Sequence, residues 1–263
     1  MSGVVDPEPE ATALRHFASY VRFVGIAVCG LALDLWSKHW AFHTLGQGHK
    51  PWVIIPHVLE FRTMLNSGAL FGIGGGQTLL FLVASACALL LVFWMFSQTS
   101  RRRWALQIAL GAILAGALGN MYDRVMVRLV DHAFPRGHHT LYTVRVGQDE
   151  HGIILAEYPP HDDGAQYRMR TTANPEGGAI VRQYPRGAVF RLERVPEEAG
   201  FVRDFIKIPT RWLGGREVWP WVFNVADMLL VGGVALLAIQ LWRDRKRLPE
   251  VRRIPVDSRG PAA

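Results

Sequence analysis

GALGNMYDRV, residues 116–125, ends a long apolar stretch in three polar side chains. They are Asn120, Asp123 and Arg124, and in an α-helix they would share one face with Gly116. Small residues recur every four positions along this apolar stretch, at Gly111, Ala115 and Gly119. Such spacing lets helices approach each other closely within a membrane. The polar face is therefore predicted to pack against a neighbouring helix.

A second stretch repeats this polar pattern about a hundred residues later. WPWVFNVADMLLVGG, residues 219–233, opens an apolar run with the same Asn-x-x-Asp spacing, at Asn224 and Asp227. The first run reaches Asp123 as it ends, and the second reaches Asp227 as it begins. Antiparallel helices would therefore bring both carboxylates to one membrane face, and paired carboxylates at one depth indicate acid-base chemistry.

The composition indicates a membrane protein. Half of the 263 residues are hydrophobic, and the mean hydropathy of +0.13 is high for a soluble chain. The apolar residues gather in stretches of about 20 residues, the length that a helix needs to cross a hydrocarbon core of ~30 Å. The predicted fold class is an all-α polytopic membrane protein whose four transmembrane helices cover 19–42, 77–97, 104–125 and 222–242.

The positive charges indicate the topology. The net charge is +7, and arginines and lysines cluster directly after the second and fourth apolar stretches. The positive-inside rule puts both clusters, and hence both termini, in the cytosol. Because the charge is explained by topology, nucleic-acid binding is excluded as a function class. The predicted cytosolic segments are a tail at 1–18, a loop at 98–103 and a tail at 243–263.

Residues 128–200 differ from the rest of the chain. They are polar and rich in Gly and Pro, and short runs such as LYTVRV and GIILAEY alternate apolar and polar residues. Such runs between turn residues are typical of short strands. We therefore expect an added β-rich periplasmic insertion in this region.

Neither a disulfide framework nor a cofactor site is expected. The two cysteines, Cys29 and Cys87, both lie in apolar stretches. His138-His139 and His161-Asp162-Asp163 lack cysteines and helical ligand spacing, so no metal site is predicted. The function must then depend on side chains alone.

Three further polar residues each allow two interpretations. Asp34 and Lys38 are spaced i, i+4 at the end of the first apolar stretch. They could form an interfacial ion pair that anchors the helix end, or they could support a functional site. Asn66 opens Asn-Ser-Gly, which fits a simple turn as well as a functional position.

Five blocks, in this order along the chain, resemble signal peptidase II, the bacterial lipoprotein signal peptidase family. Together they cover the chain from about residue 22 to 242 apart from the insertion, which is much longer than the connection usual in that family. The blocks are Asp34-Leu-Trp-Ser37-Lys38, Asn66-Ser-Gly68-Ala69-Leu-Phe71-Gly72, Gly116-Ala117-Leu-Gly119-Asn120-Met-Tyr-Asp123-Arg124, Val202-Arg-Asp204-Phe205 and Phe223-Asn224-Val-Ala226-Asp227.

The resemblance implies an intramembrane aspartyl endopeptidase of the bacterial inner membrane, with Asp123 and Asp227 as the catalytic pair and no metal or cofactor. Its substrate would be a diacylglyceryl-modified prolipoprotein, cut just before the lipidated cysteine. A small periplasmic β-cradle with a short helix would come from 43–76 and 201–221. We expect membrane lipid as a partner and a monomeric chain. The residues expected to bind substrate or support the pair are Asp34, Lys38, Asn66, Gly68, Asn120, Arg124, Asn224 and Ala226.

Two other functions use the same residues. A proton-coupled transporter would carry protons on the paired acids, but four spans without a visible repeat and acids away from the midplane argue against it. A structural anchor for the insertion would tolerate substitution at both aspartates.

Overall fold

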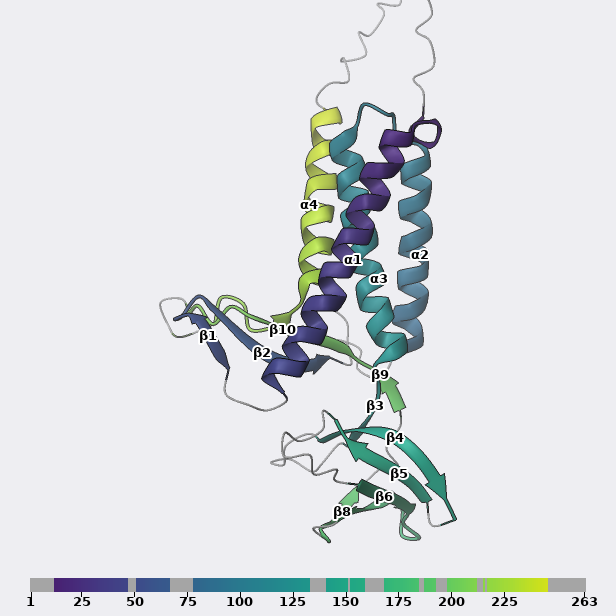
Figure 1. The fold of residues 1–263 in the computed structure, drawn as a ribbon, viewed down its shortest axis with the longest axis vertical. Coiled ribbons are helices and arrows are strands. Elements are labelled where there is room, and N and C mark those ends of the chain that lie inside the picture. Colours follow the sequence, from purple (N-terminus) through teal and green to yellow (C-terminus); the bar gives the residue numbers. More distant parts are fainter. Residues whose placement is uncertain are drawn as a thin grey trace, which may run out of the picture.

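The described residues form four α-helices, which stand side by side in an up-and-down bundle (Figure 1). The computed structural model describes residues 12–46, 51–66, 78–132, 141–150, 152–158, 168–184, 187–192, 198–211, 215 and 217–245. A short 3-10 turn, η1 (Ala13–Arg15), precedes the bundle. The helices are α1 (Phe17–Leu45), α2 (Thr78–Ser97), α3 (Trp104–Met126) and α4 (Val225–Arg245).

The bundle has the dimensions of a membrane domain. Within the described ranges, α1, α3 and α4 are long and apolar enough to cross a bilayer, while the apolar part of α2 found there, Leu82–Ser97, is shorter. Large apolar side chains such as Val28, Leu33 and Leu90 are exposed on the outside of the bundle. A bundle with an apolar exterior fits a lipid environment, and the prediction of a polytopic membrane protein is confirmed.

Helix α3 lies at the centre and packs against each of the other three helices. Its glycines explain how closely the backbones approach. A Cβ on Gly111 would lie 2.6 Å from the carbonyl oxygen of Phe23, and one on Gly116 would lie 2.4 Å from that of Ala226. Only glycine fits at these positions, so α1 and α4 both lie directly against α3.

A four-stranded antiparallel sheet lies at one end of the bundle (Figure 1). Its core contains Phe42, Leu65, Phe201 and Phe205, which pack between the sheet and the end of α1. The strands, in the order β1-β2-β10-β11, are β1 (Trp52–Ile55), β2 (Leu59–Asn66), β10 (Val202–Lys207) and β11 (Val222–Phe223).

The insertion forms a second antiparallel sheet with the order β8-β7-β6-β5-β4-β3-β9. One face of this sheet buries its own core, which includes Leu155, Met169 and Val181. The strands are β3 (Arg128–His132), β4 (Leu141–Asp149), β5 (Gly152–Glu157), β6 (Arg168–Ala173), β7 (Ala179–Tyr184), β8 (Val189–Leu192) and β9 (Glu198–Gly200).

The label all-α therefore holds only for the helical bundle, because two antiparallel sheets make up much of the chain, in the regions expected to form a β-cradle and a β-rich insertion. The insertion is added without displacing β10 from the end of α3. Its first strand, β3, pairs with its last, β9, and Phe201 N donates to Val127 O at 3.0 Å. A Cβ on Gly200 would lie only 2.0 Å from the carbonyl oxygen of Arg124. The chain thus returns to the end of α3, and β10 starts there.

Candidate active site

Asp227 lies in the first turn of α4, where Asn224 caps the helix. The Asp227 N–H donates to Asn224 Oδ1 at 3.0 Å, and the Asn224 N–H donates to Asp227 Oδ2 at 3.2 Å. This reciprocal pair is a capping box with aspartate in the acidic position. Asn120 Nδ2 on α3 donates to Asp227 Oδ1 at 2.8 Å. The Asn-x-x-Asp spacing therefore caps α4 and fixes the orientation of its carboxylate.

A second carboxylate reaches the same place from strand β10. Asp204 is 1% exposed, and its two oxygens accept hydrogen bonds from Asn224 Nδ2 at 2.6 Å and from Asn66 Nδ2 at 3.0 Å. Asn224 thus donates to both carboxylates, through its side chain to Asp204 and through its backbone to Asp227.

Burial, and then the nearby carboxylate of Asp227, raise the pKa of Asp204 to about 8 from its ordinary 3.8. The hydrogen bonds from Asn66 and Asn224 act in the opposite direction but are the weaker influence. A neighbouring carboxylate disfavours the ionised form of an acid, so Asp204 loses its proton at a higher pH than an exposed aspartate does. Near neutral pH, Asp204 therefore keeps its proton.

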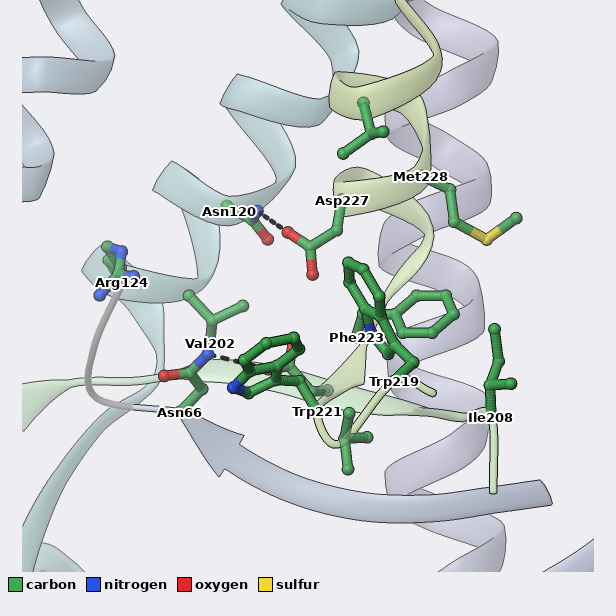
Figure 2. Close-up of a pocket in the computed structure, with 13 residues that line it drawn as sticks. Asn66, Asn120, Arg124, Val202, Ile208, Trp219, Trp221, Phe223, Asp227 and Met228 are labelled. Atoms are coloured by element: carbon green, nitrogen blue, oxygen red, sulfur yellow. Dashed lines mark hydrogen bonds between the residues drawn. The ribbon is translucent and has the colours of Figure 1, made fainter. Parts of the chain in front are cut away.

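Both carboxylates line a cavity of about 420 Å³ between α4 and the four-stranded sheet (Figure 2). Asn66, Asn120 and Arg124 supply its other polar groups. The rest of its lining is apolar or aromatic: Val202, Ile208, Trp219, Trp221, Val222, Phe223, Met228 and Val231. An apolar pocket with a few converging polar groups is typical of a ligand site.

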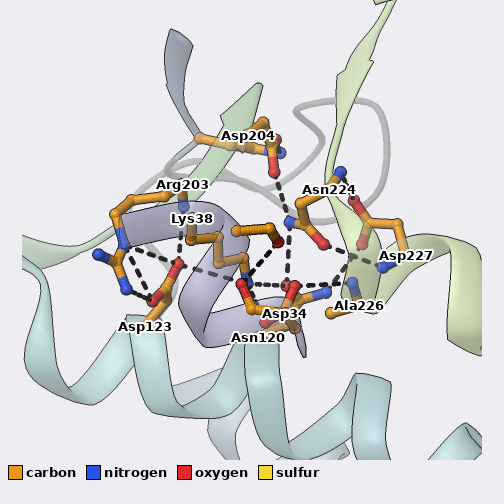
Figure 3. A network of polar contacts seen from close by, with 11 residues as sticks. Asp34, Lys38, Asn120, Asp123, Arg203, Asp204, Asn224, Ala226 and Asp227 are labelled. Carbon is orange, nitrogen blue, oxygen red and sulfur yellow. Dashed lines mark hydrogen bonds and ion pairs between the residues drawn. The ribbon is translucent and has the colours of Figure 1, made fainter. Parts of the chain in front are cut away.

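Asp123 lies outside this lining, in a buried ionic cluster beside it (Figure 3). Its side chain is fully buried, and Lys38 Nζ lies 3.4 Å from Oδ2. Arg203 binds it twice, through the guanidinium at 2.7 Å and through the backbone N–H at 2.9 Å. Buried charges require partners of this kind, so the geometry fits a structural role for the Asp123 carboxylate.

Lys38 connects this cluster to the pocket. Its ammonium lies 2.8 Å from Asp34 Oδ2 and donates to Asn120 Oδ1 at 3.2 Å. Asp34 Oδ1 in turn accepts the N–H of Ala226 at 2.8 Å, close to Asp227 in the chain. A chain of contacts therefore runs from Asp123 through Lys38 and Asn120 to Asp227.

The structure brings together nearly all the residues that the sequence singles out. Gly68 lies outside the described residues. Two members of the network were missed by the sequence reasoning, Arg203 and Asp204. Asp204 could have been found from the sequence, because it is an acid in the middle of the largely apolar segment VRDFIK and lies inside one of the five blocks.

No group of three metal-binding side chains occurs among the residues that the structure describes. His138-His139 and His161-Asp162-Asp163 fall outside them. The chemistry available in the described pocket is therefore that of carboxylates, amides and one guanidinium.

Comparisons with known proteins agree on one family. The model of the family described as Signal peptidase (SPase) II matches residues 26–243. The lipoprotein signal peptidase of Rhodopirellula baltica is 39% identical over 126 residues, which are 45% of this chain and 56% of that protein. The lipoprotein signal peptidase of Streptomyces griseus is 38% identical over 124 residues, 47% of this chain and 61% of that protein. The chain thus spans little more than half the length of these curated relatives.

The fold is also similar to that of a solved bacterial membrane enzyme, with a TM-score of 0.54 and 22% sequence identity. The similarity covers 92% of this chain and 96% of the other. A second structure described in the same words gives a TM-score of 0.50, also at 22% identity, over 84% of this chain and 93% of that one. These likenesses concern the fold.

Proposed function

Because the chain belongs to the signal peptidase II family, we propose that it is a lipoprotein signal peptidase. It is then an aspartyl endopeptidase that removes the signal peptide from diacylglyceryl-modified prolipoproteins, cleaving before the lipidated cysteine. The observation that carries the proposal is the largely apolar pocket between the beginning of α4 and the four-stranded sheet, because both Asp204 and Asp227 line it. A proton-coupled transporter would be expected to carry its acids near the bilayer midplane, whereas Asp227 lies in the first turn of α4 and Asp204 lies on β10.

The geometry favours Asp204 as the partner of Asp227. The sequence pattern suggested Asp123 instead, but its carboxylate is occupied by Lys38 and Arg203 and does not line the pocket. A group that activates water must reach the substrate directly or through one water. Asp204 and Asp227 both line the pocket, so either can meet a peptide bound there.

The two acids take different roles in this mechanism. Asp227 lies at the N-terminus of α4, where the helix dipole favours a negative charge, so it acts as the base that removes a proton from the attacking water. Asp204 holds the shared proton, hydrogen-bonds the developing oxyanion and then protonates the leaving amine. Asn224 and Asn120 keep the pair oriented, and Lys38 with Asp123 supports Asn120 from behind.

The apolar walls provide for the lipid and the signal peptide. The apolar and aromatic side chains near Asp227 in Figure 2, on the side formed by α4 and the segment before it, are Trp219, Trp221, Phe223 and Met228. Burying each methylene of an acyl chain contributes ~0.8 kcal/mol, so a diacylglyceryl group would hold the adjoining peptide at the acids.

In the cell we place the enzyme in the bacterial inner membrane with both termini cytosolic. Arg101, Arg102 and Arg103 lie between α2 and α3, and Arg243 and Arg245 end α4, all at the end of the bundle away from the pocket. The positive-inside rule supports a cytosolic position for that end and a periplasmic position for the pocket and the insertion.

The direct test uses a lipidated precursor and the same precursor with its cysteine replaced by serine, which cannot carry the lipid. Purified full-length protein is expected to cleave only the lipidated form at an appreciable rate, because the acyl chains supply most of the binding free energy. Mass spectrometry of the products gives both the rate and the cleaved bond. Equal cleavage of the two precursors, or cleavage at another bond, would contradict the proposed specificity.

The pH dependence gives a second test. Because the pKa of Asp204 is raised to about 8, the rate of cleavage is expected to fall as the pH rises through about 8. Between the ordinary value of 3.8 and about 8, the folded state holds a proton that the unfolded state has lost, so the free energy of unfolding falls across that window. The measurements are rate-pH and thermal-unfolding profiles. Asp204→Asn serves as the control, since it should lose this part of the pH dependence of unfolding; a rate that stays constant well above pH 8 would contradict the assignment.

A further inference from the structure

A second hollow lies at the opposite end of the bundle, between the beginning of α3 and the end of α4. Its volume is about 530 Å³. Trp104, Ile108 and Leu236 form an apolar wall, and Gln240, Arg243 and Asp244 lie toward the helix ends. None of these residues belongs to the network around Asp204 and Asp227.

The groove changes from apolar to polar along its length. Leu236, Gln240 and Arg243 follow one another at helical spacing on the same face of α4. With a rise of ~1.5 Å per residue, the arginine lies about 10 Å further along the helix than the leucine. Leu236 and Ile108 are half-buried, whereas Trp104 is 59% exposed at the edge. This change from apolar to polar lining matches a lipid, which has acyl chains at one end and a polar headgroup at the other.

Arg243 is the positive charge of the groove lining that has no ion-pair partner among the described residues. Arg103 forms an ion pair with Asp244, so these two charges cancel. Arg243 is exposed and, within the part of the chain that the structure describes, forms no ion pair or side-chain hydrogen bond. Arg101 and Arg102 lie one turn before α3 and add to the positive potential at this end.

We propose that this groove binds one anionic glycerophospholipid of the leaflet on this side. The acyl chains lie along Ile108 and Leu236, and the headgroup phosphate accepts hydrogen bonds from Arg243 and from the side-chain amide of Gln240. Basic pockets between helices at the cytosolic end of membrane proteins bind anionic headgroups in this way. The preference for anionic over zwitterionic lipid comes from Arg243, because the Arg103 and Asp244 pair is neutral.

The test is native mass spectrometry of the full-length protein in detergent, titrated with phosphatidylglycerol or with phosphatidylcholine of the same acyl chains. The parent is expected to retain one phosphatidylglycerol, and Arg243→Gln to weaken its retention roughly five-fold, the effect of one interfacial arginine. Arg245→Gln is the matched control. It removes an exposed arginine from the same helix turn but not from the groove lining, so retention should stay near that of the parent.

A second variant tests the apolar part. Leu236→Trp would fill the groove while leaving every charge in place, so it should displace the lipid without changing the net charge. Retention of phosphatidylglycerol by Arg243→Gln at the parent's level, or equal retention of the two lipids by the parent, would overturn the proposal. So would an equal loss in Arg243→Gln and Arg245→Gln, since that would indicate a diffuse charge effect.

Discussion

Asp204→Asn and Asp227→Asn are each expected to reduce cleavage of a lipidated precursor by at least ~10²-fold, the effect of removing one general acid or base. Asp204 and Asp227 are the only two carboxylates among the described residues that line the pocket, so no other acid there can take over either role. Asparagine keeps the shape and part of the hydrogen bonding, so both variants should fold in the membrane. The measurement is the rate of precursor cleavage, combined with thermal unfolding of the same preparations.

Asp123→Asn separates the two possible acid pairs. Asp123 binds Lys38 and Arg203 in a fully buried setting, so losing its charge leaves those cations undercompensated. Its main effect should be on stability, with a lower midpoint of thermal unfolding than in Asp204→Asn. The activity that folded Asp123→Asn retains should still fall through about pH 8, because Asp204 is unchanged.

The opposite pattern would restore the pair that the sequence suggested. If Asp123→Asn unfolded at the parent's temperature but did not cleave, and Asp204→Asn cleaved normally, Asp123 would be the partner of Asp227. A structural anchor would show differently again, since the parent would not cleave the precursor, and Asp204→Asn and Asp227→Asn would then affect only stability.

The sequence was enough to predict much of this site because its signals are local. The apolar stretches indicated membrane helices, and the glycines of GALGN indicated close packing on α3. The Asn-x-x-Asp spacing at Asn224 forms a helix cap. A cap can be recognised in the sequence because it involves only the residues of one helix turn. Each of these features is decided by residues within a few positions of one another.

The pairing between distant segments could not be predicted from the sequence. Asp123 lies near the end of α3 and Asp204 lies on β10. Their positions along the chain do not say which of the two acids faces the pocket. That depends on β10 pairing with β2, which puts Arg203 against Asp123 and turns Asp204 toward Asn224. The sequence likewise predicted strands in the cradle and the insertion but not which of them pair, so the label all-α understated the two sheets.

Lys38→Met is expected to lower the free energy of unfolding by about 3–5 kcal/mol, the cost of removing one partner from a buried ion pair. The ammonium of Lys38 lies between the carboxylates of Asp34 and Asp123, and all three side chains are fully buried. Methionine fills a similar volume but removes the cation that lies between those two carboxylates, while Arg203 still binds Asp123. The loss is measured by unfolding the variant and the parent in the same detergent.

Lys207→Met provides the matched control. Lys207 is also buried, but its partner Glu217 is 31% exposed and can be hydrated once the ammonium is gone. Removal of Lys207 should therefore cost less than removal of Lys38, although Lys207 also donates to Trp219 O at 3.0 Å. Equal losses in the two variants would mean that burial of the lysine stem, rather than charge balance, stabilises this region.

Adding Asp34→Asn to Lys38→Met tests the charge balance directly. The double variant leaves Asp123 paired with Arg203 and keeps an oxygen that can accept the N–H of Ala226. It should therefore recover part of the stability that Lys38→Met loses, because the remaining buried charges are again equal in number. If the double variant is instead as unstable as the sum of its two single changes, the ammonium stabilises the site through its hydrogen bond to Asn120. In that case the position of Asn120, and through it Asp227, depends on Lys38 itself.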